Sequence, residues 1–351
     1  MIYEFFSGSW AAADQEGIVK FRMDTDRETI EKEYAFTGIL RPSYLAFNPD
    51  KTILYTVQEE TPEGKVHALK LEQDGLVPLK DLSTKGADPC HVSMDLNCRL
   101  MFADNYTSGS IAVYRMGKDG LPAEMCDFVQ HRFEQTPRQE AGVNQTRQEG
   151  PHCHYTKEHN GQAFVADLGM DRVFIYDIDF KNGKFTDTGK RISFPAGCGP
   201  RHIEFHRTDP DIIYVICELA SRIMVFRRDE EAADGSGYVL KQDISTLPED
   251  FRGENIAAAV KMQNRLLFAT NRGHDSIALY HVEDDGCLTL KQIVKTGGRT
   301  PRDFTMFGDF CVIADQDSDS IDVLKVDWET ETMTPTKMRA ETPKPTCIRK
   351  Y

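Results

Sequence analysis

Residues 199–228 read "GPRHIEFHRTDPDIIYVICELASRIMVFRR", and this stretch decides the fold. It starts with a glycine–proline pair, continues into an apolar strand, turns at "RTDPD" and returns in a second apolar strand that ends near Glu218. The last part, "SRIMVFRR" (221–228), alternates apolar and polar side chains, as a strand with one buried face does. Short strands joined by tight turns predict a small antiparallel sheet.

The same pattern recurs along the chain. Proline-led segments comparable to residues 199–218 are "RPSYLAFNPDKTILYTVQ" (41–58), "DPCHVSMDLNCRLMFADN" (88–105), "GPHCHYTKEHNGQAFVAD" (150–167) and "TPRDFTMFGDFCVIADQ" (300–316). Segments comparable to "SRIMVFRR" are "GIVKFRM" (17–23), "GKVHALKL" (64–71), "GSIAVYRM" (109–116), "DRVFIYDI" (171–178), "DSIALYHV" (275–282) and "DSIDVLKV" (319–326). Seven copies of roughly four strands each, at a period of about 44 to 62 residues, predict an all-β, seven-bladed β-propeller formed by a single domain, residues 1–351.

The two ends of the chain complete each other in this scheme. The first copy lacks a proline-led inner strand, and the last residues, "KPTCIRKY" (344–351), resemble that strand and nothing more. We therefore expect the C-terminal strand to pair with the N-terminal strands, which closes the ring and removes exposed sheet edges. The polar insertion at 131–150 is expected to form a long loop over one face.

Composition limits the classes of partner. A net charge of −14 argues against a nucleic-acid or anionic-membrane surface, and no apolar run of about 18 residues exists. The nine cysteines are odd in number and include no C-x-x-C pair, which favours reduced thiols in the cytoplasm. The N-terminal "MIYEFFSGSWAAADQEG" lacks a basic region and is expected to be mature structure. We expect a monomer or homodimer.

The repeat register predicts where a site lies. In an up-and-down sheet, the proline-led loops and the loops after the second strand emerge at the same end. The residues that follow the proline are Ser43, Cys90, His152, Arg201, Ile256, Arg302 and Thr346, and those that end the second strand are Gln58, Asn105, Asp167, Glu218, Asn271 with Arg272, and Gln316. An acidic chain thus gathers His152, Arg201, Arg272 and Arg302 at one channel mouth, a pattern that suits an anionic small molecule.

Structural roles compete with functional ones at several of these positions. Asp275 and Asp319 precede the third strand and are expected to be turn residues, whereas Asp167 could serve either purpose. The side chains of Asn105 and Gln316 are expected to form hydrogen bonds with groups of their loops. Zinc at His152 and His154 is not favoured, because further ligands would have to be invented.

The chain resembles the bacterial 6-phosphogluconolactonase family of seven-bladed propellers, which is itself similar to the fungal carboxy-cis,cis-muconate cyclase. The motifs that carry the resemblance are "RQEGPHCH", "VADLGMDRVFIYDID", "GPRHIEFH", "ATNRGHDSIALY", "GGRTPRDF" and "ADQDSDSIDVLKVD". The resemblance implies hydrolysis of the ester of 6-phospho-D-glucono-1,5-lactone to 6-phosphogluconate in the pentose phosphate pathway, with no metal or organic cofactor. Many family members carry glutamate where this chain has Ala257.

The resemblance also implies site residues. The catalytic candidates that it implies are His152 (or His154), Arg201, Glu218 and Arg272. The repeat register and the polar loop before Pro151 supply the candidate substrate-binding residues, which are His91, Arg147, His154, Asp167, Asn271, Arg302 and Gln316. Glu218 or His152 is expected to be the general base, with Arg201 and Arg272 stabilising the oxyanion. Arg302, His91 or Arg147 could hold a phosphate.

Three alternatives stay open at this point. The chain could be a lactonase or cycloisomerase that acts on another carboxylated lactone. It could instead be a non-catalytic propeller that binds a sugar acid or a protein, because fold does not imply function. A calcium-dependent lactonase is the third.

Overall fold

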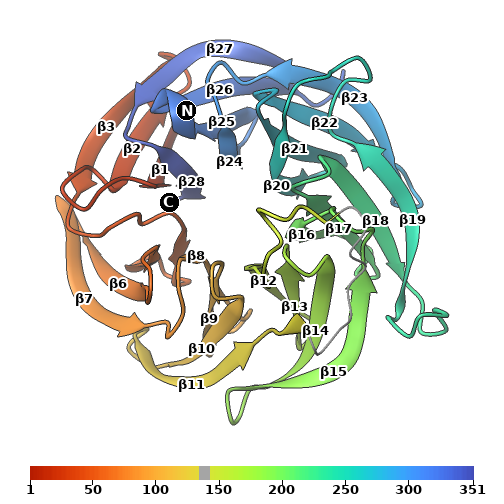
Figure 1. The fold of residues 1–351 in the computed structure, drawn as a ribbon. Helices are drawn as coiled ribbons and strands as arrows, with labels where there is room; N and C mark the ends of the chain where they lie inside the picture. The colour runs from red at the N-terminus through yellow and green to blue at the C-terminus, as the bar shows by residue number, and fades with distance from the viewer. Residues whose placement is uncertain (134–142) are drawn as a thin grey trace. The chain divides into compact units, whose positions relative to one another are not determined.

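The structure, a computed structural model, describes residues 1–133 and 143–351. Over these ranges the chain forms seven four-stranded sheets, most of whose strands are labelled in Figure 1. The chain divides into a larger unit (Met1–Ala11, Gln15–Thr37 and Arg201–Tyr351) and a smaller unit (Ala12–Asp14 and Gly38–Pro200). Within the described ranges, no helix could span a lipid bilayer.

The smaller unit holds three of the sheets, and each is built from strands that are consecutive in the chain. The strands are β4 (Leu45–Phe47), β5 (Ile53–Gln58), β6 (Lys65–Glu72) and β7 (Gly75–Ser83), then β8 (Pro89–Met94), β9 (Leu100–Asn105), β10 (Ser110–Met116) and β11 (Pro122–Gln130), then β12 (Cys153–His159), β13 (Gln162–Asp167), β14 (Arg172–Asp179) and β15 (Lys184–Ser193). The insertion predicted at 131–150 is described only at its two ends, and the rest of that prediction lies outside the described residues.

The larger unit holds the other four sheets. Three of them comprise β16 (Pro200–Phe205), β17 (Ile212–Cys217), β18 (Arg222–Arg228) and β19 (Tyr238–Ser245), then β20 (Ile256–Gln263), β21 (Leu266–Arg272), β22 (Ser276–Val282) and β23 (Leu288–Lys295), then β24 (Pro301–Phe307), β25 (Phe310–Asp315), β26 (Ser320–Asp327) and β27 (Thr332–Glu341), with the short 3-10 helix η2 (Gln316–Ser318) after β25.

The fourth sheet joins the two ends of the chain. Its strand order is β28-β1-β2-β3, formed by β28 (Pro345–Lys350), β1 (Ile2–Ser9), β2 (Ile18–Asp24) and β3 (Thr29–Phe36). Strand β28 runs antiparallel to β1, with Phe5 opposite Lys350 and Gly8 opposite Cys347. The predicted pairing of the C-terminal strand with the N-terminal strands is therefore confirmed.

The residue that leads each third strand has a defined backbone role. Asp171, Ser221, Asp275 and Asp319 all adopt positive φ, between 49° and 53°, a conformation that glycine, asparagine and aspartate tolerate best. The Asp275 carboxylate also accepts a hydrogen bond from the Thr300 N–H at 2.8 Å, and that of Asp319 accepts one from Lys344 N–H at 2.8 Å. Each aspartate thus ties its turn to the loop that starts the next sheet, which confirms the turn prediction.

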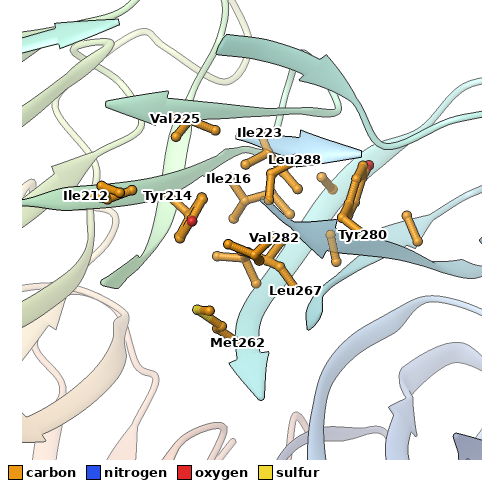
Figure 2. Packing of buried hydrophobic residues seen from close by; sticks show 14 residues of the cluster. Ile212, Tyr214, Ile216, Ile223, Val225, Met262, Leu267, Tyr280, Val282 and Leu288 are labelled. Carbon is orange, nitrogen blue, oxygen red and sulfur yellow. The ribbon is translucent and has the colours of Figure 1, made fainter. Parts of the chain in front are cut away.

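Third strands such as β10 and β22 are buried on both faces, so the prediction of a single buried face is wrong for them, whereas it is confirmed for β2, whose burial alternates from Val19 to Asp24. Strand β22 is buried at six of its seven positions, and β10 at its first five. The cause is sheet-on-sheet packing: Ile216 and Val225 of one sheet pack in the same apolar cluster as Leu267 and Tyr280 of the next (Figure 2). Burying each such aliphatic side chain stabilises the fold by roughly 1.5–3 kcal/mol.

Candidate active site

Three side chains of the larger unit form a buried ionic cluster. Arg201 lies at the start of β16, Glu218 directly follows β17, and Arg272 ends β21. The Glu218 Oε2 atom lies 2.8 Å from Arg201 Nε and 2.7 Å from Arg272 Nη2, and the three side chains are 2%, 3% and 11% exposed, in that order. Two guanidinium groups share one carboxylate, so the cluster carries a net positive charge in a strongly acidic chain.

A β-bulge in β20 supplies the other contacts of this cluster. The register between β20 and β21 shifts between Ala257 and Val260, and bulges of this kind re-aim backbone groups. The Ala257 carbonyl accepts a hydrogen bond from Arg272 Nη2 at 2.8 Å, and the Ala258 carbonyl accepts one from Arg201 Nη1 at 2.9 Å. Both alanines are fully buried. Ala257 therefore lies against the cluster, where its carbonyl positions Arg272.

The strand-end register corrects one part of the sequence interpretation. Asn105, Cys217, Asn271 and Asp315 each pair with the first residue of the following strand. Glu218 and Gln316 lie one residue beyond that position, as Arg272 does, so the predicted alignment of these two with Asn105 and Asn271 is wrong by one residue. The reason is that Cys217 and Asp315 pair with the first residue of the next strand, whereas Glu218 and Gln316 follow the last residues of β17 and β25.

Asn271 illustrates the position that pairs with the first residue of the third strand. Its side-chain N–H groups donate to the Thr246 carbonyl at 2.7 Å and to Ser276 Oγ at 3.2 Å, and its oxygen accepts from Thr246 Oγ1 at 2.6 Å. Asn105 contacts Thr84 and Ser110 in the same way. These amides link consecutive sheets within each unit.

His152, in the smaller unit, has a defined tautomer. Its Nδ1 lies 2.9 Å from the Tyr106 carbonyl, which can only accept, so Nδ1 carries the proton and Nε2 of the neutral ring keeps its lone pair. Nε2 lies 3.3 Å from Oε1 of Glu149. The ring stacks on the Tyr106 ring, with centroids 4.4 Å apart and planes 9° apart. His152 is therefore held in a form that can accept a proton.

Tyr106 connects His152 to two other predicted site residues. Its ring makes an edge contact with His154 at 5.8 Å, and its hydroxyl accepts a hydrogen bond from Arg147 Nη2 at 3.1 Å. Sequence reasoning did not single out Tyr106. The signal that could have found it is its position directly after the end of β9, which matches that of Glu218 after β17.

His91 belongs to a separate aromatic group in the same unit. Its Nδ1 lies 2.8 Å from Asp104 Oδ2, and the Thr156 N–H donates to that same oxygen at 2.8 Å. The imidazole lies between the rings of Tyr44 and Tyr155, at 4.5 and 4.2 Å. Asp104 thus orients His91, a partnership that the sequence did not reveal.

Asp167 forms a buried trio with His131 and Cys153. Its Oδ2 lies 2.6 Å from His131 Nδ1, the Cys153 sulfur lies 3.3 Å from the same nitrogen, and the three donor atoms are all within 4.8 Å of one another. Burial, followed by the charge of Asp167, raises the pKa of the Cys153 thiol well above its usual value. Among the described residues this is the one group of donors that could hold a metal ion, and it contains neither His152 nor His154.

The trio has a sufficient account within the fold. His131 and Asp167 occupy the places that Thr84 and Asn105 occupy one sheet earlier, after a fourth strand and at the end of a second strand. The other Asp167 oxygen accepts from the His152 N–H at 2.8 Å, and His131 Nε2 lies 2.9 Å from the Tyr176 hydroxyl. We interpret the group as a link between sheets that also fixes the backbone at His152.

Arg302 and Gln316 lie side by side in the larger unit. Arg302 Nη1 donates to Gln316 Oε1 at 3.0 Å. The structure therefore brings Arg201, Glu218 and Arg272 into contact, and separately joins Arg302 with Gln316, and His152, His154 and Arg147 with Tyr106. The grouping of His152 with the arginine cluster stays a prediction that rests on the repeat register.

Comparison with known proteins decides the family. The model of the family described as "Lactonase, 7-bladed beta-propeller" matches residues 4–350. The chain belongs to this lactonase family. Its fold is accordingly a seven-bladed β-propeller, which confirms the prediction made from the repeats.

Relatives within the lactonase family align over nearly the full chain. A 6-phosphogluconolactonase of Bacillus subtilis is 30% identical over 357 residues, covering 99% of this chain and 98% of the relative. A crystal structure of a protein from Lactobacillus plantarum is 27% identical with a TM-score of 0.89, and the periplasmic gluconolactonase of Pseudomonas aeruginosa is 25% identical with a TM-score of 0.88. The first covers 100% of both chains; the second covers 100% of this chain and 99% of the other. These relationships support a lactone-hydrolysing activity.

Proposed function

We propose that the protein hydrolyses the ester of 6-phospho-D-glucono-1,5-lactone to 6-phosphogluconate. The observation that carries the proposal is the Arg201–Glu218–Arg272 cluster, which concentrates positive charge in a chain of net charge −14. The full-length similarity to a protein named 6-phosphogluconolactonase supports the choice of substrate.

The reaction needs a base for the attacking water and a partner for the developing oxyanion. In the proposed mechanism, His152 Nε2 accepts a proton from water as the water oxygen bonds to the lactone carbonyl carbon. Arg201 and Arg272 stabilise the negative charge on the carbonyl oxygen. The carbonyl re-forms as the bond to the ring oxygen breaks, and the imidazolium returns its proton to that oxygen.

The contacts of Glu218 favour His152 as the base. The Glu218 Oε2 atom lies against two guanidinium groups, so this oxygen is already engaged as their shared counter-charge. His152, in contrast, has its proton on Nδ1 through the Tyr106 carbonyl, with Nε2 3.3 Å from the Glu149 carboxylate. In this mechanism Glu149 stabilises the imidazolium, and Glu218 is a positioning residue for the two arginines.

A second candidate substrate is unphosphorylated gluconolactone. The specific observation in its favour is the 25% identity and TM-score of 0.88 to a protein named as a gluconolactonase. The two candidates differ only in whether the protein must bind a phosphate.

The test is hydrolysis of both lactones by the purified protein, with the spontaneous rate subtracted. We expect the phosphorylated lactone to be preferred, His152→Ala to lower kcat by about 10²–10⁴-fold and Arg201→Ala by about 10²–10³-fold. Arg265→Gln, which removes an arginine from an exposed ion pair with Asp284, is the matched control and should retain the wild-type rate. Wild-type rates in the His152 and Arg201 variants would contradict the mechanism, and no hydrolysis above the spontaneous rate would contradict the function.

A further inference from the structure

We infer that Arg302 is the residue that binds the anionic group of the substrate and so sets the preference for a phosphorylated lactone. The inference rests on the proposed function and adds the residue that determines specificity. The inference follows from a pair of contacting side chains that recurs at the same two positions in several sheets. In the sheet of Arg302, the partner of the arginine is a neutral amide and not a carboxylate.

The pairing joins the residue after the leading proline to the residue after the second strand. Ser43 donates to the Glu59 carboxylate in one sheet, and Arg201 contacts the Glu218 carboxylate in another. At the same two positions of a third sheet, Arg302 contacts Gln316. Only in this last pair is the partner a neutral amide, so the partner does not cancel the charge of the arginine.

The local contacts of Arg302 support the conclusion that no partner cancels its positive charge. Among the residues that the structure describes, Arg302 makes no ion pair, and its contact with Gln316 uses Nη1 alone. Its side chain is half-buried at the start of β24. A guanidinium has five N–H donors, and those on Nε and Nη2 are suited to bidentate binding of phosphate oxygens.

Backbone contacts place Arg302 near the arginine cluster of the same unit. The Thr300 N–H, two residues before Arg302, donates to the carboxylate of Asp275, which lies three residues after Arg272. The Gln316 N–H donates to the Thr300 carbonyl at 3.1 Å. Strand β24 also packs against β20 and β21, the strands that carry Ala257, Ala258 and Arg272.

The other two candidates for phosphate binding, His91 and Arg147, belong to the smaller unit, whereas Arg302 belongs to the unit that carries Arg201 and Arg272. His91 contacts Asp104 at 2.8 Å, and Arg147 donates to the Tyr106 hydroxyl at 3.1 Å. A substrate with an ester at one end and a phosphate at the other needs two separate cationic positions. The Arg201–Arg272 pair and Arg302 meet this requirement within one unit.

The test compares kcat/KM for 6-phosphogluconolactone with that for unphosphorylated gluconolactone. We expect Arg302→Gln to lower the ratio of the two values by about 10- to 100-fold, mainly through the KM for the phosphorylated lactone. Gln316→Glu keeps the arginine but supplies a carboxylate partner, and should lower the ratio in the same direction. Arg302→Lys should restore part of it, because lysine keeps the charge but not the fork geometry.

Arg299→Gln is the matched control, since Arg299 belongs to the same loop and contacts the Asp317 carbonyl. In this variant, the ratio of kcat/KM for the phosphorylated lactone to kcat/KM for the unphosphorylated lactone should equal that of the wild type. A ratio unchanged by both Arg302→Gln and Gln316→Glu, in a protein that hydrolyses the phosphorylated lactone, would overturn the inference and leave the proposed function standing. A wild-type protein that hydrolyses neither lactone would overturn the proposed function instead.

Discussion

At the scale of single residues, the site is defined by how each charged side chain is held. Glu218 has two guanidinium partners, whereas His152 has one nitrogen fixed by a backbone carbonyl and the other near a carboxylate. Both residues are almost fully buried. Their surroundings favour different roles. Glu218 positions the two arginines and balances their charge, whereas His152 is the proposed proton acceptor.

This difference leads to a prediction for Glu218→Gln. The variant keeps the shape of the side chain but removes the charge that balances Arg201 and Arg272. We expect a loss of about 3–5 kcal/mol in the free energy of unfolding, because two buried guanidinium groups lose their counter-charge. We expect kcat to fall about 10²-fold, since the arginines shift.

The pH profile separates positioning from base catalysis at Glu218. If Glu218 positions the arginines, the acid limb of kcat/KM persists in Glu218→Gln at a lower plateau, and His152→Ala abolishes that limb. Loss of the limb in Glu218→Gln would instead identify Glu218 as the base. Denaturant unfolding and stopped-flow rates measured over a series of pH values provide both measurements.

At the scale of elements, a repeated link joins the ends of several second strands to the residue after the preceding fourth strand. Thr84 with Asn105 and Thr246 with Asn271 form it through neutral groups. The sheet of β24–β27 uses Asp315 with Thr296, at 2.9 Å, instead. Burial and then the neighbouring Asp322 raise the pKa of Asp315 to about 8. This sheet therefore holds a carboxyl group whose pKa lies well above its ordinary value.

The raised pKa of Asp315 predicts a stability that falls with increasing pH. Because the folded value exceeds the ordinary value of 3.8, the stabilising contribution is fully present at acid pH and is lost as pH rises towards about 8. We expect the wild type to lose a few kcal/mol relative to Asp315→Asn between about pH 5 and 8. Asp315→Asn supplies the amide group that Asn105 and Asn271 carry at the same position.

Guanidinium unfolding at a series of pH values measures this difference directly. The control is Asp284→Asn, which changes a fully exposed carboxylate and should follow the wild-type curve. If the free energy of unfolding varied with pH in the same way for the wild type and Asp315→Asn, Asp315 would be ionised in the folded protein at neutral pH and the prediction would be wrong.

At the scale of the whole molecule, the ends of the chain depend on a charged group in the neighbouring sheet. Strand β28 contributes Arg349, whose Nη1 lies 2.8 Å from Asp303 Oδ2, and Lys261 lies 2.6 Å from the other oxygen. Burial would raise the pKa of Asp303, but Lys261 and Arg349 outweigh it and keep the pKa below its ordinary value. The carboxylate thus fastens the closing strand.

Two variants test this arrangement. Asp303→Asn should lower the free energy of unfolding by about 3–5 kcal/mol, because Lys261 and Arg349 lose a buried partner. Deletion of residues 344–351 should leave β1 as an open edge and give an aggregating protein. Size-exclusion chromatography and denaturant unfolding measure both effects. A soluble deletion variant with wild-type stability would contradict the assigned role of β28.

The sequence by itself determined the seven repeats, the pairing of the chain ends and the turn roles of Asp275 and Asp319. These features are periodic or local, so the spacing of prolines, glycines and aspartates reports them directly. It also indicated that Arg201, Glu218 and Arg272 lie together, because equivalent loops of consecutive repeats emerge at the same end.

Only the tertiary structure decided how those residues are held. The arginines bind the Ala257 and Ala258 carbonyls because a β-bulge turns these groups towards them, and a bulge leaves no clear sign in a run of alanines. His152 owes its tautomer to the carbonyl of Tyr106, 46 positions away in the chain. The one-residue offset of Glu218 and Gln316 likewise depends on strand pairing. Hydrogen bonds over such separations are set by the packing of sheets, which the spacing of residue types does not encode.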